Sequence, residues 1–560
     1  RLRGQGPGPV LVAAGSALAI RDAMGVAVEQ MTVIAAGAAG SAITARGVLG
    51  LALTDLVVAV LAANLDLPPA AIALSGAVAG VRIADNLLLA PDGVRALEGR
   101  DDNAASFLLT AALAIEDNLL WCTRSAVSLD GPVLHLLATR VERNQVLGCR
   151  QMALVLTGFG APASSMRIAA NHVQVPAGAV ACASDGCWIV DNKLVATDAT
   201  LPSVGIELRA GLDPTGADQA HLLANQIAGC TTAAILIASP VRQLICKLNI
   251  VERCANGLLM ADDAEGGAVA IENNQFDDIG PQASTDAAAL TAGILLARVE
   301  AATVAGNALT RVGTRAVGGG IRAALMTFGV VRLRAQGNRI TALAPASDFG
   351  GLAAGVLSSG AYTQLDLLHN EIDRDLDPAT QPRSAAPWAA VYVTGGTAAA
   401  TNTTTGFTNA NPTPNATAGF AQRFGNRRVL PVDGGASIVF DGDRAFVAQA
   451  AARADGGAAA LLGNVFAAAS ALPLVLLQAE RECLFSDNRC EHVGSTGGFA
   501  AVMLATQVAI LSANRVRNNT DVAIDVLGAR TVAAVANITT GIIRTPGGLP
   551  AAMQPLNLRA

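Results

Sequence analysis

The chain contains little lysine, few aromatic residues and no concentration of charge. Lys193 and Lys247 are the only lysines among 560 residues, aromatic residues make up 3% of the chain, and charged residues make up 15%. The formal net charge of -6 is small for this length, and there is no basic run. The sequence therefore lacks the footprint of a nucleic-acid-binding protein. With 52% hydrophobic residues it is also too apolar to be disordered.

Long apolar runs are absent, although the mean hydropathy is +0.44. The most apolar window, residues 48–63, is interrupted by Asp55. No run reaches the roughly 20 apolar residues that a membrane-spanning helix needs. A solenoid whose interior is filled by short, β-branched strands has the same hydropathy, so we expect no membrane span.

The nine cysteines are an odd number and form no CxxC pair. This argues against a disulfide scaffold and favours a reducing compartment, as for a cytoplasmic assembly. The chain begins at Arg1 without a leader-like segment, so we expect it to be a portion of a longer polypeptide. A Gly-rich phosphate loop, a GxSxG motif and an HExxH motif are all missing.

What the chain does contain is a repeat, shown most clearly in residues 292–309. A short apolar strand is followed by two or three residues, then Asn, one further residue and an apolar residue. Met31, Asp55 and Leu248 occupy the Asn position in weaker copies, and Asn249 lies beside Leu248. The repeated asparagines are Asn86, Asn118, Asn144, Asn171, Asn192, Asn225, Asn274, Asn307, Asn338, Asn370, Asn426, Asn464, Asn488, Asn514 and Asn537.

The spacing of the repeat indicates the architecture. The separations from Asn118 to Asn144, Asn171 and Asn192 are 26, 27 and 21 residues in turn. Helical repeats need longer, 3.6-periodic units, and leucine-rich repeats need a stricter consensus. Fixed strands with elastic connections predict an all-β parallel β-helix, a solenoid of roughly 17 coils.

The asparagine has a physical role in such a coil. We expect it to take the left-handed backbone conformation at a tight bend. Its amide can also bond to the equivalent amide one coil away, so that stacked asparagines form a ladder with a rise of about 4.8 Å. Four cysteines, Cys122, Cys149, Cys230 and Cys254, follow the repeated position by four to six residues. We expect them to stack in the interior as small hydrophobic residues.

The domain organisation follows from where the repeat begins, stops and resumes. We predict a connection over residues 1–17, a β-helix over 18–396, a Thr/Asn-rich loop insertion over 397–425, a continuation of the β-helix over 426–545 and a connection to downstream sequence over 546–560.

This pattern resembles the right-handed parallel β-helix of the pectate-lyase-like superfamily, with its carbohydrate-binding and sugar-hydrolase type repeats. The resemblance extends from about Leu18 to Ile543. It implies that an active relative would place acidic residues, often with Ca²⁺, and an Arg or Lys on one external face. It also allows an extracellular location.

Three groups of residues are candidate sites, and each has a simpler interpretation. The candidate catalytic residues are Asp441, Asp443 and Arg444, which would also suit a turn. The candidate metal ligands are Asp373, Asp375 and Asp377, which would also suit a solvated turn. The candidate ligand-binding aromatic residues are Tyr362, Trp388 and Tyr392, which would also suit packing. The histidines show no ligand spacing.

Three functions remain open. The preferred hypothesis is a non-enzymatic structural or binding module of a larger polypeptide or multi-subunit assembly, such as a tail spike, an injection machine or an adhesin. One alternative is a polysaccharide lyase or glycoside hydrolase, or an inactive relative that still binds glycan. The other is a periplasmic or secreted accessory β-helix that serves substrate or metal delivery. The expected partners are other domains or subunits, with glycan as a further candidate and without nucleic acid.

Overall fold

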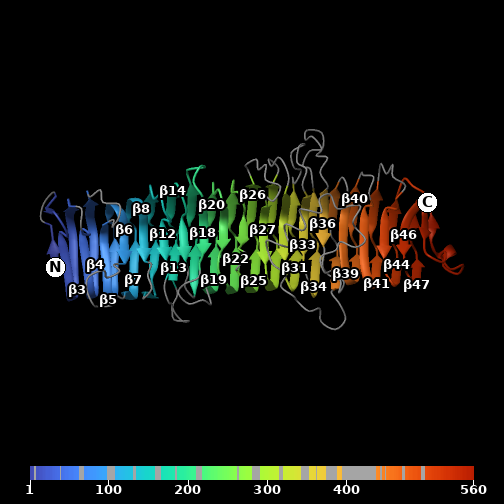
Figure 1. Ribbon diagram of the computed structural model, residues 1–560, viewed down its shortest axis with the longest axis horizontal. Helices are drawn as coiled ribbons and strands as arrows, with labels where there is room; N and C mark the ends of the chain where they lie inside the picture. Colours follow the sequence, from blue (N-terminus) through green and yellow to red (C-terminus); the bar gives the residue numbers. More distant parts are fainter. Residues whose placement is uncertain are drawn as a thin grey trace. The chain divides into compact units, whose positions relative to one another are not determined.

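The computed structural model divides into two compact units. Unit 1 comprises Arg1–Cys254 with Asp263–Glu265, and unit 2 comprises Ala255–Asp262 with Gly266–Ala560. Placement is described for all residues except 5–7, 38–39, 62–68, 97–107, 130–133, 158–165, 183–185, 210–216, 262–263, 281–289, 314–319, 342–351, 361, 374–387, 394–436, 442–443, 448–449, 469–472 and 493–498. Within each unit the strands of successive coils run side by side (Figure 1).

Each unit is a parallel β-helix whose coils contribute to three sheets, named A, B and C in chain order. In unit 1, for example, one coil passes through β18 (Val204–Leu208) in sheet A, β19 (Ala217–Leu223) in sheet B and β20 (Gln226–Ala228) in sheet C. The next coil then pairs β21 (Ala233–Ile237) in parallel with β18. Each such coil extends all three sheets by one strand.

The remaining strands of unit 1 follow this order. Sheet A contains β12 (Leu154–Leu156) and β15 (Val180–Cys182); sheet B contains β1 (Leu2–Arg3), β7 (Leu108–Glu116), β9 (Leu134–Leu137), β10 (Arg140–Glu142), β13 (Met166–Ala169), β16 (Cys187–Val190) and β22 (Val241–Lys247); and sheet C contains β2 (Val10–Ala13), β11 (Gln145–Leu147), β14 (His172–Val175), β17 (Lys193–Ala196) and β23 (Ile250–Glu252).

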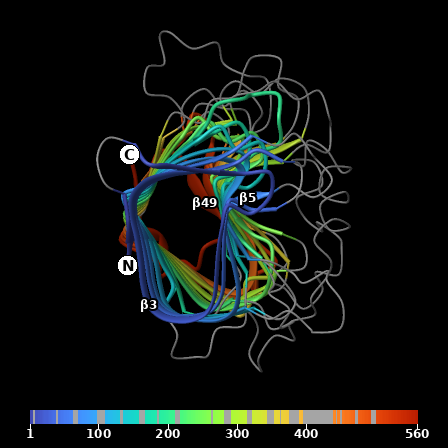
Figure 2. The same cartoon turned by 90° about the vertical axis from the view of Figure 1, so that its left-hand side faces the viewer.

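In the first coils, long strands continue round the corners between sheets. They are β3 (Leu18–Ala35), β4 (Ile43–Val60), β5 (Ala70–Ala84), β6 (Leu87–Ala96) and β8 (Leu119–Leu129). Figure 2 shows β3 bending as it follows the outline of a coil. The bends in β3 fall where Asp22, Gly25 and Gln30 take positive φ values. Residues that tolerate this left-handed region let the chain turn without interrupting the hydrogen-bonded ladder.

Unit 2 repeats the arrangement. Its sheet A contains β24 (Leu258–Met260), β27 (Leu290–Ala297), β30 (Ile321–Phe328), β33 (Leu352–Ser359), β36 (Trp388–Val393), β43 (Val502–Ala505), β46 (Val522–Leu527) and β49 (Ile542–Arg544). Sheet B contains β25 (Gly266–Glu272), β28 (Val299–Ala305), β31 (Arg332–Gln336), β34 (Gln364–Leu368), β37 (Ser437–Asp441), β44 (Val508–Ser512) and β47 (Thr531–Val535).

Sheet C of unit 2 contains β26 (Gln275–Ile279), β29 (Ala308–Val312), β32 (Arg339–Thr341), β35 (Glu371–Asp373), β38 (Arg444–Val447), β40 (Val465–Ala468), β42 (Arg489–His492), β45 (Arg515–Arg517), β48 (Ile538–Thr539) and β50 (Leu558–Arg559). Two strands, β39 (Ala450–Leu462) and β41 (Val475–Ser486), turn from sheet A into sheet B. A short 3-10 helix, η2 (Gln554–Leu556), precedes β50.

The core of each unit lies inside its coils, because side chains alternate along a strand between the interior and the outer face. Val, Ile, Leu and Ala supply most of the buried residues, and Phe276, Phe466 and Phe485 are the largest. All nine cysteines are free and buried, which confirms that Cys122, Cys149, Cys230 and Cys254 lie in the interior. The apolar composition therefore reflects a packed solenoid interior. No helix in the described ranges is long and apolar enough to cross a membrane.

The asparagine ladder predicted from the repeat is present in both units. In unit 1 side-chain amides are hydrogen-bonded from Asn86 to Asn249. In unit 2 they are bonded from Asn274 to Asn370 and again from Asn464 to Asn557. The ladder asparagines from Asn86 to Asn537 are almost fully buried. Asn426 lies outside the described residues.

The expectation that the asparagine itself is left-handed was wrong. The positive φ belongs to the residue before it, for example Asp117 (58°) before Asn118 and Arg143 (54°) before Asn144. This order has a physical reason, since the sharp turn one residue earlier aims the asparagine side chain into the coil. The preceding side chain then faces outward, where a charged residue is tolerated.

The same rule corrects two of the weaker copies. Asn249 is the ladder residue, because its Oδ1 accepts from Asn225 Nδ2 at 3.0 Å, and Leu248 is the left-handed residue before it (φ 59°). Leu248 is consequently 61% exposed. Likewise Asp55 is left-handed (φ 55°), and the next residue, Leu56, donates its backbone N–H to Asn86 Oδ1. Met31 pairs with Leu56 and so holds the predicted position.

The segments predicted to flank the repeat also contain strands. Within residues 1–17, β1 and β2 pair in parallel with β3. Within residues 546–560, β50 pairs with β48, and Asn557 Oδ1 accepts from Asn537 Nδ2 at 2.8 Å. The predicted insertion over 397–425 lies outside the described residues.

Candidate functional site: the charged network outside the asparagine ladder

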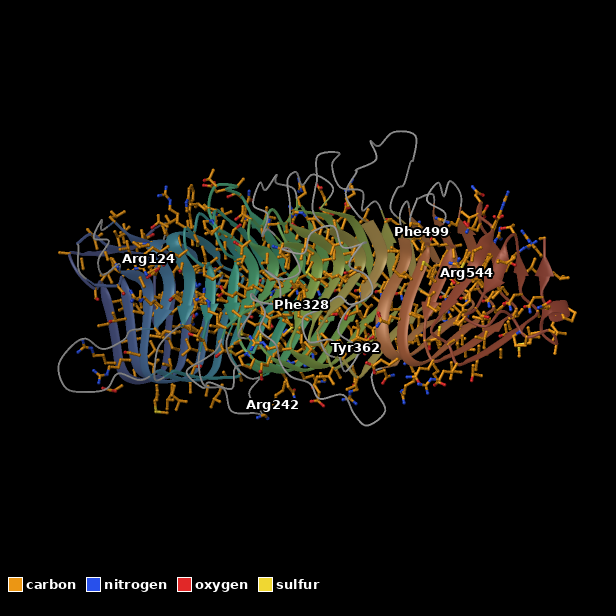
Figure 3. The ribbon with its side chains drawn as sticks, turned by 45° about the vertical axis from the view of Figure 1, so that its right-hand side comes forward. Arg124, Arg242, Phe328, Tyr362, Phe499 and Arg544 are labelled. Carbon is orange, nitrogen blue, oxygen red and sulfur yellow. The ribbon has the colours of Figure 1, made fainter. Side chains whose placement is uncertain are left out.

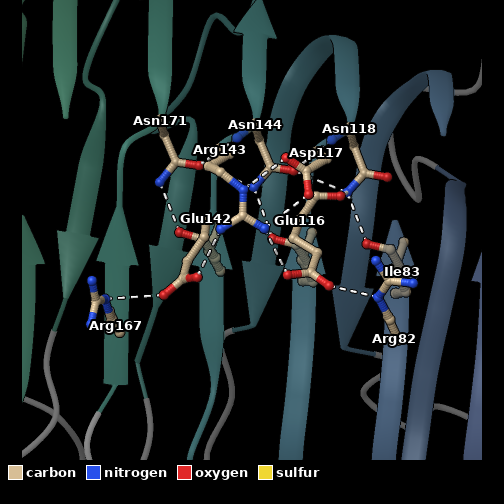
Figure 4. Close-up of polar contacts among 12 residues, drawn as sticks. Arg82, Ile83, Glu116, Asp117, Asn118, Glu142, Arg143, Asn144, Arg167 and Asn171 are labelled. Atoms are coloured by element: carbon tan, nitrogen blue, oxygen red, sulfur yellow. Dashed lines mark hydrogen bonds and ion pairs between the residues drawn. The ribbon is translucent and has the colours of Figure 1, made fainter. Parts of the chain in front are cut away.

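Two stacks of side chains meet at the corner between sheets B and C of unit 1 (Figure 4). The inner stack is the asparagine ladder. Asn144 Oδ1 accepts from the backbone N–H of Asn118 at 3.1 Å and from its Nδ2 at 2.9 Å. Asn144 Nδ2 donates to Ile115 O at 2.9 Å and to Asn171 Oδ1 at 3.0 Å. Each amide therefore bonds to the coils on both sides of it, which fixes their register.

The outer stack consists of arginines and carboxylates at the positions just before the asparagines. Arg143 Nε donates to Asp117 Oδ1 at 2.8 Å, and its Nη2 donates to Asp117 Oδ2 and Glu116 Oε2, both at 2.9 Å. Its Nη1 donates to Glu142 Oε2 at 3.2 Å within its own coil. Arg143 thus holds a bidentate pair with one residue of the previous coil and single bonds to two others.

Two further arginines extend this network along the stack. Arg82 Nε donates to Glu116 Oε1 at 2.6 Å, and Arg167 Nε lies 3.0 Å from Glu142 Oε1. Three arginines and three acids are therefore linked across successive coils, with balanced charge. The arginine side chains are about half exposed, whereas those of Glu116 and Glu142 are 16% and 13% exposed. We name these six residues, Arg82, Glu116, Asp117, Glu142, Arg143 and Arg167, the charged network.

The network determines the protonation of its acids. The pKa of Glu116 is lowered, chiefly by the hydrogen bond from Arg82, although partial burial acts in the opposite direction. The pKa of Asp117 is lowered chiefly by its hydrogen bond from Arg143. Both groups are therefore ionised at neutral pH. A general acid needs a raised pKa, so this arrangement suits cross-linking of coils and does not suit proton donation.

An aromatic pair lies on the outer face of sheet B next to the network. Trp188 on β16 and His221 on β19 are register partners, and their rings stack with centroids 4.0 Å apart and planes 10° apart. Trp188 is 39% exposed. Partial burial lowers the pKa of His221, so its imidazole is neutral at pH 7. Arg167 is the register partner of Trp188 on the preceding coil, so the pair continues the outward column of the network.

A second exposed indole lies on the outer face of sheet C. Trp121, on β8, is 60% exposed. Its ring lies against Gly148, where a Cβ atom would come within 3.3 Å of the indole Cδ1 and Nε1. Gly148 has φ +84°, so the turn itself also favours glycine there. A flat indole supported by backbone and open to solvent is a surface on which a ligand ring could stack.

The sequence-predicted site residues are not gathered into one described site. Of the predicted catalytic residues, Asp441 ends β37 and Arg444 begins β38, but their side chains and the whole of Asp443 lie outside the described residues. Of the predicted metal ligands, Asp373 ends β35, but its side chain and the whole of Asp375 and Asp377 lie outside the described residues. Among the residues that are described, no group of three or more His, Cys, Asp or Glu could hold a metal ion.

The predicted aromatic patch is described in part. Tyr362, labelled in Figure 3, and Tyr392 on β36 are only 3% and 4% exposed. The side chain of Trp388 lies outside the description. In sheet A of unit 2, both faces of β30 are buried along its whole length. The register partners of its outward Met326, Leu295 on β27 and Leu357 on β33, are also buried.

Sequence reasoning missed the charged network and the Trp188–His221 pair. A signal was available, because Trp188 and His221 each stand four residues before a ladder asparagine, as do Arg140 and Arg167. Residues at one offset from the ladder occupy one column, so equal offsets would have placed the two rings together.

No protein-family model matches the chain, and no curated protein matches it. The class that the fold defines is the parallel β-helix solenoid.

Proposed function

We propose that the chain is a non-enzymatic structural or binding module, a parallel β-helix that serves a larger multidomain protein or assembly in the manner of a tail spike, an injection machine or an adhesin. The observation that carries this proposal is the double stack of unit 1. There the buried amides and the outer carboxylates are both used to hold one coil against the next.

The outer charges support a scaffold role in a second way. A glycan-cleaving site needs a carboxyl group with a raised pKa beside an ionised one. In the charged network the pKa values of Glu116 and Asp117 are both lowered by arginine. An arginine also pairs with a carboxylate of the neighbouring strand in unit 2, where Arg544 Nε, on the residue labelled in Figure 3, donates to Asp525 Oδ1 at 2.9 Å in sheet A.

The outer face of sheet A in unit 2 supports it further. Over β27, β30 and β33 the outward column carries Leu295, Met326 and Leu357, which are nearly inaccessible. Buried apolar side chains on an outer face serve packing, whereas a sugar-cleaving groove is lined with accessible acids and cations.

Electron microscopy of the protein in its native assembly, at side-chain resolution, tests this proposal. We expect the outer faces of the sheets to be contacted by other domains or subunits. A solvent-filled groove on which residues 373–377 or 441–444 converge would overturn it. The proposal would also be overturned if the protein depolymerised a glycan and if Asp441→Asn abolished this activity without affecting folding.

A second candidate is an inactive, glycan-binding relative within the pectate-lyase-like superfamily, or an active lyase or hydrolase of that group. The exposed Trp121 platform favours glycan binding. In a glycan array this candidate predicts binding that Trp121→Ala reduces at least tenfold. Leu248→Ala, at another exposed apolar side chain, is the matched control and should leave binding unchanged. Equal binding by both variants would exclude Trp121 as the platform.

A further inference from the structure

Two pairs of cysteines are stacked on successive coils at the corner that leads from sheet C to sheet A in unit 1. One pair is Cys230 and Cys254, each two residues beyond the register partners Ala228 and Glu252. Both thiols are buried. The backbone N–H of Cys230 donates to Cys254 Sγ at 3.4 Å, so the two residues are in direct contact across the coils.

The two thiols of this pair differ in acidity, and Cys254 is the more acidic. Its pKa is lowered, first by the hydrogen bond from the Cys230 thiol, against the effect of burial, and further by the backbone N–H groups of Cys230 and Gly229 and by the charge of Arg253. The pKa of Cys230 is raised well above its usual value by the same hydrogen bond and by burial. Cys254 is therefore the thiol of the pair that ionises more readily, and Cys230 is the one that keeps its proton.

The second pair, Cys122 and Cys149, serves as an internal control for the first. Cys122 and Cys149 occupy the same corner on two earlier coils and are also buried. Burial raises the pKa of Cys149 to about 12, and the nearby Asp92 carboxylate acts in the same direction. The pKa of Cys122 is also raised well above its usual value, chiefly by burial, with further contributions from Cys149 and Asp92. Of these four buried thiols, only that of Cys254 has a lowered pKa.

We propose that Cys230 and Cys254 form a dithiol site that a small hydroperoxide oxidises reversibly to a disulfide between neighbouring coils. The geometry is suitable, because parallel strands lie about 4.8 Å apart, within the roughly 4.4–6.8 Å between Cα atoms that disulfides span. A small oxidant is required since both sulfurs are covered. The product joins two coils covalently and closes the chain between them.

The reaction is balanced in two steps. The Cys254 thiolate attacks one oxygen of hydrogen peroxide, the O–O bond breaks, and sulfenic acid and hydroxide form. The Cys230 sulfur then attacks Cys254 Sγ, an S–S bond forms, and the sulfenic oxygen leaves as water with the proton from Cys230. Peroxide is reduced and the two thiols are oxidised; an external thiol reverses the change.

Differential alkylation of the whole folded chain tests this proposal. The protein is treated with dilute hydrogen peroxide, quenched, alkylated in denaturant and mapped by mass spectrometry. We expect a disulfide-linked Cys230–Cys254 peptide that dithiothreitol cleaves, formed at least tenfold faster than any change at Cys122 and Cys149. Equal oxidation of the two pairs, or no oxidation of Cys254, would overturn the proposal.

Single substitutions separate the roles of the two sulfurs. In Cys230→Ser we expect Cys254 to stop at the sulfenic acid, which dimedone traps. In Cys254→Ser we expect Cys230 to stay reduced. If a serine variant does not fold, as judged by circular dichroism, the alanine variant takes its place. Trapping at Cys230 in the absence of Cys254 would show that the assignment of the nucleophile is wrong.

Discussion

The inner and outer stacks at the corner of sheets B and C use neighbouring residues of the same coils, yet they differ in what water can reach. Asn144 is almost completely buried, whereas the side chain of Arg143 is 48% exposed. A buried polar group left without a partner costs roughly 1–3 kcal/mol. An exposed ion pair contributes only about 0.2–1 kcal/mol. We therefore expect the buried asparagines to contribute more to the free energy of unfolding than the exposed ion pairs do.

The largest effect is expected from Asn144→Ala. This change removes the acceptor of two Asn118 donors and the donor to Ile115 O and Asn171 Oδ1. We expect a loss of roughly 2–5 kcal/mol in local unfolding free energy, because several buried groups lose partners together. Native-state hydrogen exchange of the amides in β10 and β11 measures it, since solenoids open locally.

A matched control lies one residue further along the chain. Gln145 is exposed on β11, so Gln145→Ala should change the unfolding free energy by less than about 0.5 kcal/mol. Similar losses in Asn144→Ala and Gln145→Ala would contradict the distinction between the buried and exposed stacks.

Asn144→Asp keeps the shape but replaces a donor by an acceptor. The ionised carboxylate that this change introduces would face Asn171 Oδ1 and Ile115 O, the two acceptors that the amide now serves. Burial and these acceptors should raise the folded pKa of the new carboxyl group above the unfolded value of about 3.9. A carboxyl group whose pKa is raised in the folded state contributes stability at low pH, and this contribution is lost as the pH rises through the folded pKa. The deficit relative to wild type should therefore shrink between pH 7 and pH 4 in urea titrations, and a constant deficit would contradict this.

Features of the fold that depend on the spacing of residues along the chain could be predicted from the sequence, whereas those that depend on the direction of a side chain could not. The distances between asparagines were sufficient to predict coils and the ladder. They did not show that the turn precedes the asparagine, so Leu248 was placed in the ladder in place of Asn249. Nor could spacing show that Arg143 turns back to Asp117, since that contact requires the outward direction of both left-handed residues. The acidic clusters near residues 373–377 and 441–444 stood out in sequence, and their side chains are not described.

Arg143→Met should have a smaller effect than either change at Asn144. It leaves Glu116, Asp117 and Glu142 near one another with less positive charge between them. We expect a loss of about 1 kcal/mol at low salt, and a smaller loss in 1 M salt because exposed charges are screened. Arg140→Met, on the outer face of the same coil, is the control. A salt-independent loss would indicate that the Arg143 stem contributes through packing.

The smallest expected effect is the pH dependence that the charged network adds to wild type. Because the folded pKa values of Glu116 and Asp117 are lowered, their contribution is fully present above the unfolded values near 4.5 and 3.8. It is lost as pH falls through the folded values. Arg143→Met removes the main cause of the lowered Asp117 pKa, whereas Arg82 still lowers the pKa of Glu116. Wild type and Arg143→Met should therefore differ in stability at pH 6, and the difference should shrink as the pH falls below the unfolded value of Asp117 near 3.8. A difference that does not shrink as the pH falls would show that Arg143 stabilises the corner by something other than its charge.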